Sequence, residues 1–80
     1  MARQELETQI ISIIEGELGL EDTPNLDDTL IEDLSADSLD LVNLVLQMEE
    51  AFAITIPDED VPALKTVGDI INYIEKRAVS

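Results

Sequence analysis

The residues able to do covalent chemistry are few, because the chain contains no cysteine and no histidine. Thiolate nucleophiles, imidazole bases, disulfides and the usual zinc ligands are therefore excluded. Among the hydroxyls, Ser38 stands out because it follows Asp37 at the start of a segment with helical periodicity. A helix N-terminus favours a phosphate, so this position suits a phosphoserine-type linkage. On spacing alone, the simpler interpretation is that Ser38 only caps a helix.

Catalysis is not expected from this set of residues. An enzyme needs an activated nucleophile or a matched acid and base, and Asp37 beside Ser38 supplies no base of the right kind. A calcium-binding loop would suit the acidity, but residues 21–33 lack its central glycine and its ligand spacing. We therefore predict a non-enzyme without a metal site.

Charge is distributed unevenly along the chain. It has 19 acidic and 4 basic residues, and none of the basic ones lies between residues 4 and 64, where every acid except Asp69 and Glu75 is found. Such a negative field repels nucleic acid and attracts basic protein patches. We expect partners with basic docking patches and no nucleic-acid binding, although composition alone also allows a role in solubility only. The basic residues are Arg3, Lys65, Lys76 and Arg77.

The first half of the chain predicts one helix and a long loop. Residues 3–16 have helical apolar spacing and end between Gly16 and Gly19. Residues 19–36 have no sustained period, and long loops in small domains are often functional. We expect a helical turn near 28–33 and four apolar side chains that pin the loop to the core: Leu26, Leu30, Ile31 and Leu34.

The second half predicts two further main helices and a short one. A helix over 38–52 begins after Asp37, a good N-cap. After Pro57 we expect a short helix that is capped by Asp58 or by Asp60, with Pro62 at its first position. Thr66 and Asp69 form a capping box for a helix that ends near 77. The fold class is all-α: a four-helix bundle in one domain, residues 1–80.

The predicted helix over 38–52 has two apolar sides. At 100° per residue, its core side contains Leu41, Leu44, Val45, Met48 and Phe52. Apolar residues are mixed with carboxylates on the other side, which suggests a surface for a partner, with leucines for burial and acids for steering. The alternative is that the loop over 19–36 covers this side. The residues on this outer side of the helix are Leu39, Asp40, Val42, Asn43, Leu46, Gln47, Glu49 and Glu50.

Three stretches resemble a known family. Residues 32–40, Glu-Asp-Leu-Ser-Ala-Asp-Ser-Leu-Asp, are similar to the phosphopantetheine attachment motif of bacterial-type acyl carrier proteins, whose core is Asp-Ser-Leu. The resemblance continues through residues 49–52, Glu-Glu-Ala-Phe, and residues 54–59, Ile-Thr-Ile-Pro-Asp-Glu, to Thr66 and Val67. Length, acidity and helix order agree with that family over residues 3–77.

The resemblance implies a mechanism. A separate phosphopantetheinyl transferase would attach 4'-phosphopantetheine from coenzyme A to Ser38, and the thiol of this arm would hold an acyl chain as a thioester. Asp37 would help to present the serine to the transferase through its magnesium ion. Acyl-processing enzymes of fatty-acid or related biosynthesis would dock on the positions that match the family's recognition helix: Leu39, Asp40, Val42, Asn43, Leu46, Glu49 and Glu50.

Three residues depart from the family pattern. Ser35 replaces the usual glycine, which predicts a stiffer or differently shaped turn. Asn43 replaces a usual acid and removes one charge from the recognition side. Pro62 shortens the short helix.

Other functions remain open from the sequence alone. They are an aminoacyl, peptidyl or polyketide-pathway carrier and an unmodified acidic docking module. Because the chain begins with Met1 and has neither a signal peptide nor an apolar run long enough to span a membrane, we expect a stand-alone, monomeric, cytoplasmic protein.

Overall fold

The chain folds as a bundle of helices around one apolar core. A computed structural model describes residues 2–78, and Met1, Val79 and Ser80 lie outside the described residues. The expectation of a stand-alone protein rests on Met1 and so is not addressed by the structure. The elements are α1 (Arg3–Leu18), α2 (Ser38–Phe52), a 3₁₀ helix η1 (Asp58–Ala63) and α3 (Val67–Ala78). Over the described residues, extended pairing is limited to one isolated bridge between Thr29 and Thr66. The all-α prediction of three main helices and one short helix is confirmed.

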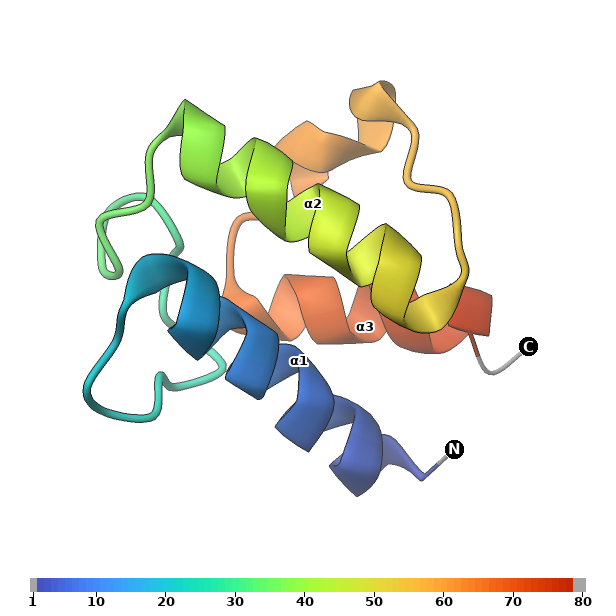
Figure 1. Ribbon diagram of the computed structural model, residues 1–80, viewed down its shortest axis with the longest axis horizontal. Helices are drawn as coiled ribbons and strands as arrows, with labels where there is room; N and C mark the ends of the chain where they lie inside the picture. Colours follow the sequence, from blue (N-terminus) through green and yellow to red (C-terminus); the bar gives the residue numbers. More distant parts are fainter. Residues whose placement is uncertain (1, 79–80) are drawn as a thin grey trace.

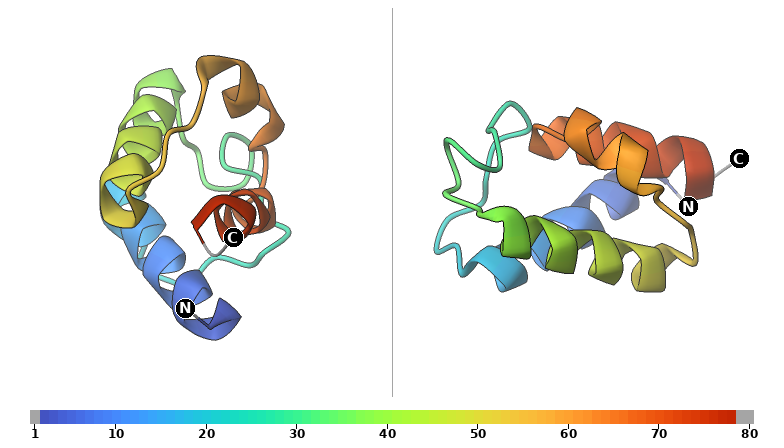
Figure 2. Two further views of the ribbon diagram at one scale, coloured as in Figure 1. Left: turned by 90° about the vertical axis from the view of Figure 1, so that its right-hand side faces the viewer. Right: turned by 90° about the horizontal axis from the view of Figure 1, so that it is seen from above.

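The three main helices lie so that the start of α2 is far from the chain ends. In Figure 1, α1 runs opposite to α2 and α3, and the N- and C-terminal ends lie at one side of the molecule. The long loop between α1 and α2 closes the other side, as the right-hand view in Figure 2 also shows. The first turn of α2 is therefore at the loop end of the bundle.

Local signals fix where the helices begin and end. The Asp37 carboxylate accepts the Asp40 N–H at 2.8 Å while Asp40 accepts the Asp37 N–H at 3.1 Å, which makes a reciprocal capping box for α2. The predicted box of Thr66 and Asp69 is present at α3, with an Asp69 N–H to Thr66 Oγ1 distance of 3.0 Å. α1 continues to Leu18 instead of ending at residue 16, because Gly19 at φ 65° supplies the left-handed cap.

The core collects apolar side chains from all three main helices and from both connecting segments. Almost none of their surface is exposed, and no polar side chain among the described residues is buried with them. The predicted core side of α2 is confirmed, since Leu44 and Met48 are buried and Leu41, Val45 and Phe52 pack against the core. The buried residues are Leu6, Ile10, Ile14, Leu30, Ala36, Leu44, Met48, Ile56, Leu64, Val67, Ile70, Ile71 and Ile74.

The long loop is held to the core by fewer side chains than expected. Leu30 is buried and Leu34 packs partly against the core, but Leu26 and Ile31 remain 40% and 60% exposed. Backbone bonds do the rest: the Leu30 N–H donates to the Lys65 carbonyl at 2.9 Å, and the Gly68 N–H donates to the Leu26 carbonyl at 2.9 Å. The predicted turn is present, with the Asp33 N–H bonded to the Thr29 carbonyl.

The short helix differs from its prediction. η1 is a 3₁₀ helix preceded by Pro57, no side chain caps it, and Pro62 lies inside it instead of at its first position. A proline is tolerated there because in a helix of six residues few N–H groups have an intrahelical partner. Asp60 does not cap η1; its carboxylate bonds to α3.

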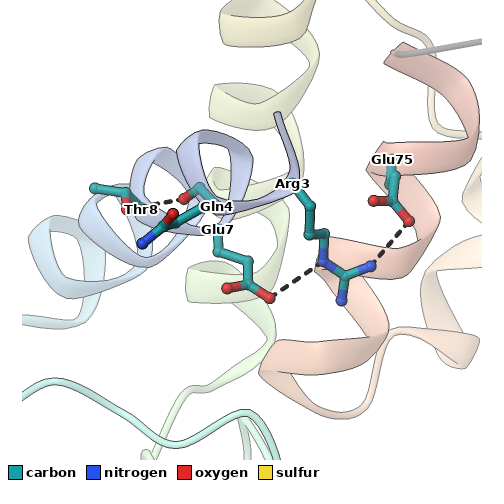
Figure 3. A network of polar contacts seen from close by, with 5 residues as sticks. All are labelled: Arg3, Gln4, Glu7, Thr8 and Glu75. Atoms are coloured by element: carbon teal, nitrogen blue, oxygen red, sulfur yellow. Dashed lines mark hydrogen bonds and ion pairs between the residues drawn. The ribbon is translucent and has the colours of Figure 1, made fainter. Parts of the chain in front are cut away.

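Arg3 connects the first helix to the last. Arg3 of α1 donates to Glu7 one turn ahead at 3.1 Å and to Glu75 of α3 at 2.8 Å (Figure 3). Both ion pairs are exposed and contribute little stability each, but the one with Glu75 joins α1 to α3 at the side away from α2's first turn. In the part of the chain that the structure describes, no helix is long and apolar enough to cross a membrane.

Candidate functional site

Ser38 is the first residue of α2 and does not cap it. The N-cap position belongs to Asp37, whose side chain receives the Asp40 N–H. The Ser38 side chain is exposed, and its hydroxyl makes no hydrogen bond with any of residues 2–78. The capping role that spacing alone allowed is therefore filled by its neighbour, and the hydroxyl is free to react.

The surroundings of Ser38 suit a phosphate. As in any α-helix, the first backbone N–H groups have no intrahelical partner and point out of the helix end, where the dipole is positive. Asp40 and Leu41 use their N–H groups for bonds to Asp37, which leaves those of Ser38 and Leu39 without a partner among residues 2–78. An exposed hydroxyl beside two such donors fits a phosphodiester-linked arm.

The turn that leads to Ser38 contains a strained residue. Ser35 has φ 59°, in the left-handed region that favours glycine. The turn is nevertheless well held, because the Ala36 N–H donates to the Leu30 carbonyl at 2.8 Å and the Ala36 side chain is buried. From the sequence we expected Ser35 to make this turn stiffer or differently shaped. The structure shows that Ser35 adopts the left-handed conformation that glycine favours.

A groove leads from Ser38 along α2 toward η1. It has a volume of about 390 Å³ and is lined on the α2 side by Ser38, Val42 and Leu46 among others, and on the far side by Asp58 and Val61. Its apolar walls and size are those of a small-molecule site.

Behind the groove lies a small apolar cavity in the core that is partly open to the surface. Its volume is about 20 Å³, close to that of one water molecule. Four residues line both the groove and the cavity and form the wall between them: Leu41, Val45, Ile56 and Val61. The sequence placed the α2 residues of this lining on the core side, but it did not predict that Val61 lies opposite them, because only the fold brings η1 to face α2. The other residues that line the cavity are Leu30, Leu44, Met48, Leu64, Ile70, Tyr73 and Ile74.

The outer side of α2 is open. Leu39, Val42 and Leu46 are 66%, 54% and 53% exposed, so the loop over 19–36 does not cover them. Glu50 is exposed on the same helix. The structure thus brings together three apolar side chains and a carboxylate on one exposed helical surface that begins at Ser38.

Three of the predicted recognition residues have partners inside the chain. Asp40 belongs to the capping box, and the Glu49 carboxylate accepts the Ile56 N–H at 2.8 Å. The amide of Asn43 donates to Glu17 of α1 at 3.3 Å, and Gln47 donates to the same carboxylate. An acid at position 43 would face Glu17 with a like charge, which gives a structural reason for the asparagine.

Comparisons with known proteins agree on one family. The family model for a phosphopantetheine attachment site matches residues 8–74. Acyl carrier proteins of Thermotoga maritima and Akkermansia muciniphila are 43% and 47% identical to this chain, each over 77 residues, and the match covers 95% of this chain and 95% and 96% of theirs. A solution structure of a candidate acyl carrier protein from Anaplasma phagocytophilum has a TM-score of 0.88 at 35% identity, covering 98% of this chain and 93% of that one.

An exposed serine at a helix N-terminus, a groove beside it and these relatives define a carrier domain. The chain belongs to the phosphopantetheine-bearing acyl carrier protein family. Its function is therefore to carry acyl groups on a covalent 4'-phosphopantetheine arm; the protein does not catalyse a reaction itself, and a separate transferase installs the arm. The arm supplies a thiol that holds the acyl group as a thioester, which explains how a thiol carrier has no cysteine.

Proposed function

We propose that Ser38 carries the arm and that the chain delivers acyl intermediates of fatty-acid biosynthesis to enzymes with basic docking patches. The observation that carries the proposal is the free, exposed Ser38 hydroxyl at the N-terminus of α2, whose capping position is occupied by Asp37. The relatives, acyl carrier proteins matched over nearly their whole length, support the acyl cargo over an aminoacyl or peptidyl one.

The attachment step uses the Ser38 oxygen as nucleophile. A bond forms between that oxygen and the phosphorus of the pantetheine phosphate in coenzyme A, the pyrophosphate bond breaks, adenosine bisphosphate leaves, and the hydroxyl proton passes to a base of the transferase. Asp37 takes part through Oδ2, which makes no hydrogen bond with residues 2–78 while Oδ1 caps α2. That free oxygen would be available as a ligand to a magnesium ion held by the transferase.

The groove and the cavity provide shelter for the acyl chain. A chain on the Ser38 arm first lies in the groove between α2 and η1 and then passes between Leu41 and Val61 into the core. Because the cavity of about 20 Å³ is far smaller than any chain of several carbons, loading must separate its walls. Burial of the methylene groups drives this separation.

Partner enzymes dock on the outer side of α2 in this proposal. Leu39, Val42 and Leu46 supply apolar surface, and Glu50 supplies a charge that is not paired with any of residues 2–78. Asp40, Asn43 and Glu49 contribute less, since their side chains are held by intramolecular hydrogen bonds. The net charge of −15 opposes self-association and nucleic-acid binding, which supports a monomeric carrier. The cytoplasmic location stays a prediction.

The test is modification of the apo protein by a phosphopantetheinyl transferase and coenzyme A, followed by intact-protein mass measurement. We expect the wild type and Ser35→Ala to gain the mass of one arm and Ser38→Ala to gain none. Ser35 is the matched control because it is an exposed serine three residues away. An arm on Ser38→Ala, or none on the wild type, would overturn the assignment.

A further inference from the structure

η1 is the least anchored wall of the interior cavity. None of its six residues is buried and no side chain caps it. The chain is fixed by a hydrogen bond on either side of η1. Before it, the Ile56 N–H donates to the Glu49 carboxylate, and after it, the Lys65 carbonyl accepts the Leu30 N–H. Between these two points η1 spans the opening of the cavity, with Val61 as its contribution to the lining.

One cluster ties η1 to α3. The Tyr73 hydroxyl donates to Asp60 Oδ2 at 2.7 Å, and the Arg77 guanidinium donates to the same oxygen at 3.3 Å. The Arg77 guanidinium carbon also lies 4.5 Å from the centre of the Tyr73 ring, within cation–π range. Over residues 2–78, Asp60 is the one η1 side chain with a polar contact to another element.

Tyr73 connects this cluster to the cavity. Its ring lines the interior cavity together with Val61, while its hydroxyl reaches Asp60 outside it. The hydroxyl–carboxylate bond is short and charge-assisted, which makes it the stronger of the two contacts to Asp60. The ion pair is about a third or more exposed on both sides and adds little by itself.

We propose that Asp60, Tyr73 and Arg77 form a clasp that limits how far η1 can move away from α3, and so sets the length of acyl chain that the cavity shelters. The proposal rests on the acyl-carrier function and on shelter of the chain in the cavity. A single clasp of this kind is outweighed by burial of a few methylene groups. Short chains therefore leave it closed, and longer chains open it at a cost.

The first test needs no arm. Hydrogen exchange in the apo protein follows two amides: the Asp60 N–H of η1, which donates to the Pro57 carbonyl, and the N–H of Leu64, the residue after η1, which donates to the Val61 carbonyl. Tyr73→Phe keeps the ring that lines the cavity and removes only the hydroxyl. We expect it, and Asp60→Ala, to speed exchange of both amides by about fivefold, the factor for one net hydrogen bond.

Glu59→Ala is the matched control, because Glu59 is an exposed acid of the same helix without a bond to residues 2–78. It removes the same charge as Asp60→Ala and should leave exchange unchanged. Equal exchange in wild type, Tyr73→Phe and Glu59→Ala would overturn the clasp, whether or not the protein carries an arm.

The second test uses protein loaded with butanoyl, octanoyl or hexadecanoyl chains, and measures the rise in melting temperature over the unloaded form of the same variant. We expect the rise for the longest chain to be larger in Tyr73→Phe and Asp60→Ala than in wild type and Glu59→Ala, with no difference for butanoyl. The same dependence on chain length in all four proteins would contradict the proposal. Failure to attach an arm would instead contradict the role of Ser38.

Discussion

At the scale of single residues, the two neighbours Asp37 and Ser38 have different roles at the start of α2. Asp37 caps α2 and Ser38 is left exposed with a free hydroxyl, although both residue types are good N-caps. The reciprocal bond with Asp40 decides which of them does so. The side chain that we propose for attachment of the arm therefore has no structural role in capping α2.

Ser35 occupies a position that favours glycine, and replacing it should stabilise the protein. Its φ of 59° costs a non-glycine residue about 1–2 kcal/mol, while glycine loses about 0.5–1 kcal/mol through the unfolded chain. We expect Ser35→Gly to raise the free energy of unfolding by about 0.5 kcal/mol in urea denaturation. Ser12→Gly, in the interior of α1, should lower it by about 0.5 kcal/mol. Destabilisation by Ser35→Gly would show that the serine side chain makes a contribution of its own.

Tyr73 should titrate unusually late. Burial first and the hydrogen bond to Asp60 second raise its pKa to about 12. Since the folded pKa lies above the unfolded value of about 10, the neutral phenol's contribution to stability is complete below pH about 10 and is lost as the pH rises toward about 12. The chain has one tyrosine and no tryptophan, so ultraviolet absorbance follows this phenol alone. A midpoint near 10 in the folded protein would contradict the contact with Asp60.

At the scale of elements, α2 presents different chemistry on its two sides, and melting experiments can distinguish them. Met48 is 1% exposed and Leu46 is 53% exposed on the same helix. We expect Met48→Ala to cost about 2–5 kcal/mol of unfolding free energy and Leu46→Ala to cost less than about 0.5 kcal/mol. Equal destabilisation in thermal melts would mean that both sides of α2 are buried and that docking occurs elsewhere.

At the scale of the whole molecule, stability should depend on salt. The net charge is −15, and the three ion pairs over the described residues use only Arg3 and Arg77. Repulsion between the remaining acids opposes folding and is screened by ions. We expect the melting temperature at neutral pH to rise from about 10 mM to about 1 M sodium chloride. A melting temperature that is flat over this range would show that repulsion does not limit stability.

The helices were predictable because their signals are local. Asp37 before α2, the pair Thr66 and Asp69, and the apolar spacing of α2 each act within a few residues. The conformation of η1, the exposure of Ile31 and the contact of Asn43 with Glu17 were not predictable. These features depend on which segments the fold brings together, and the spacing of apolar residues in the sequence does not predict such contacts.

The candidate site, like the fold, was predictable only where its signals are local. Motif and helix position identify Ser38, but the groove, the cavity and the clasp need η1 opposite α2 and α3. Asn43 and Glu49 are instructive here, because their place on the helical wheel suggests a docking role while their hydrogen bonds are intramolecular. A sequence pattern gives the side of a helix and not the contacts made there.

The central claim is that Ser38 holds the arm and that the arm alone holds the acyl group. The most direct measurement is a peptide-level mass spectrum of the protein after treatment with the transferase and hexadecanoyl coenzyme A, before and after hydroxylamine. We predict one added group, located on Ser38, from which hydroxylamine removes the acyl part and leaves the phosphopantetheine, because the chain has no cysteine to carry a thioester itself. An added group on any other residue, or an acyl group that resists hydroxylamine, would contradict the account.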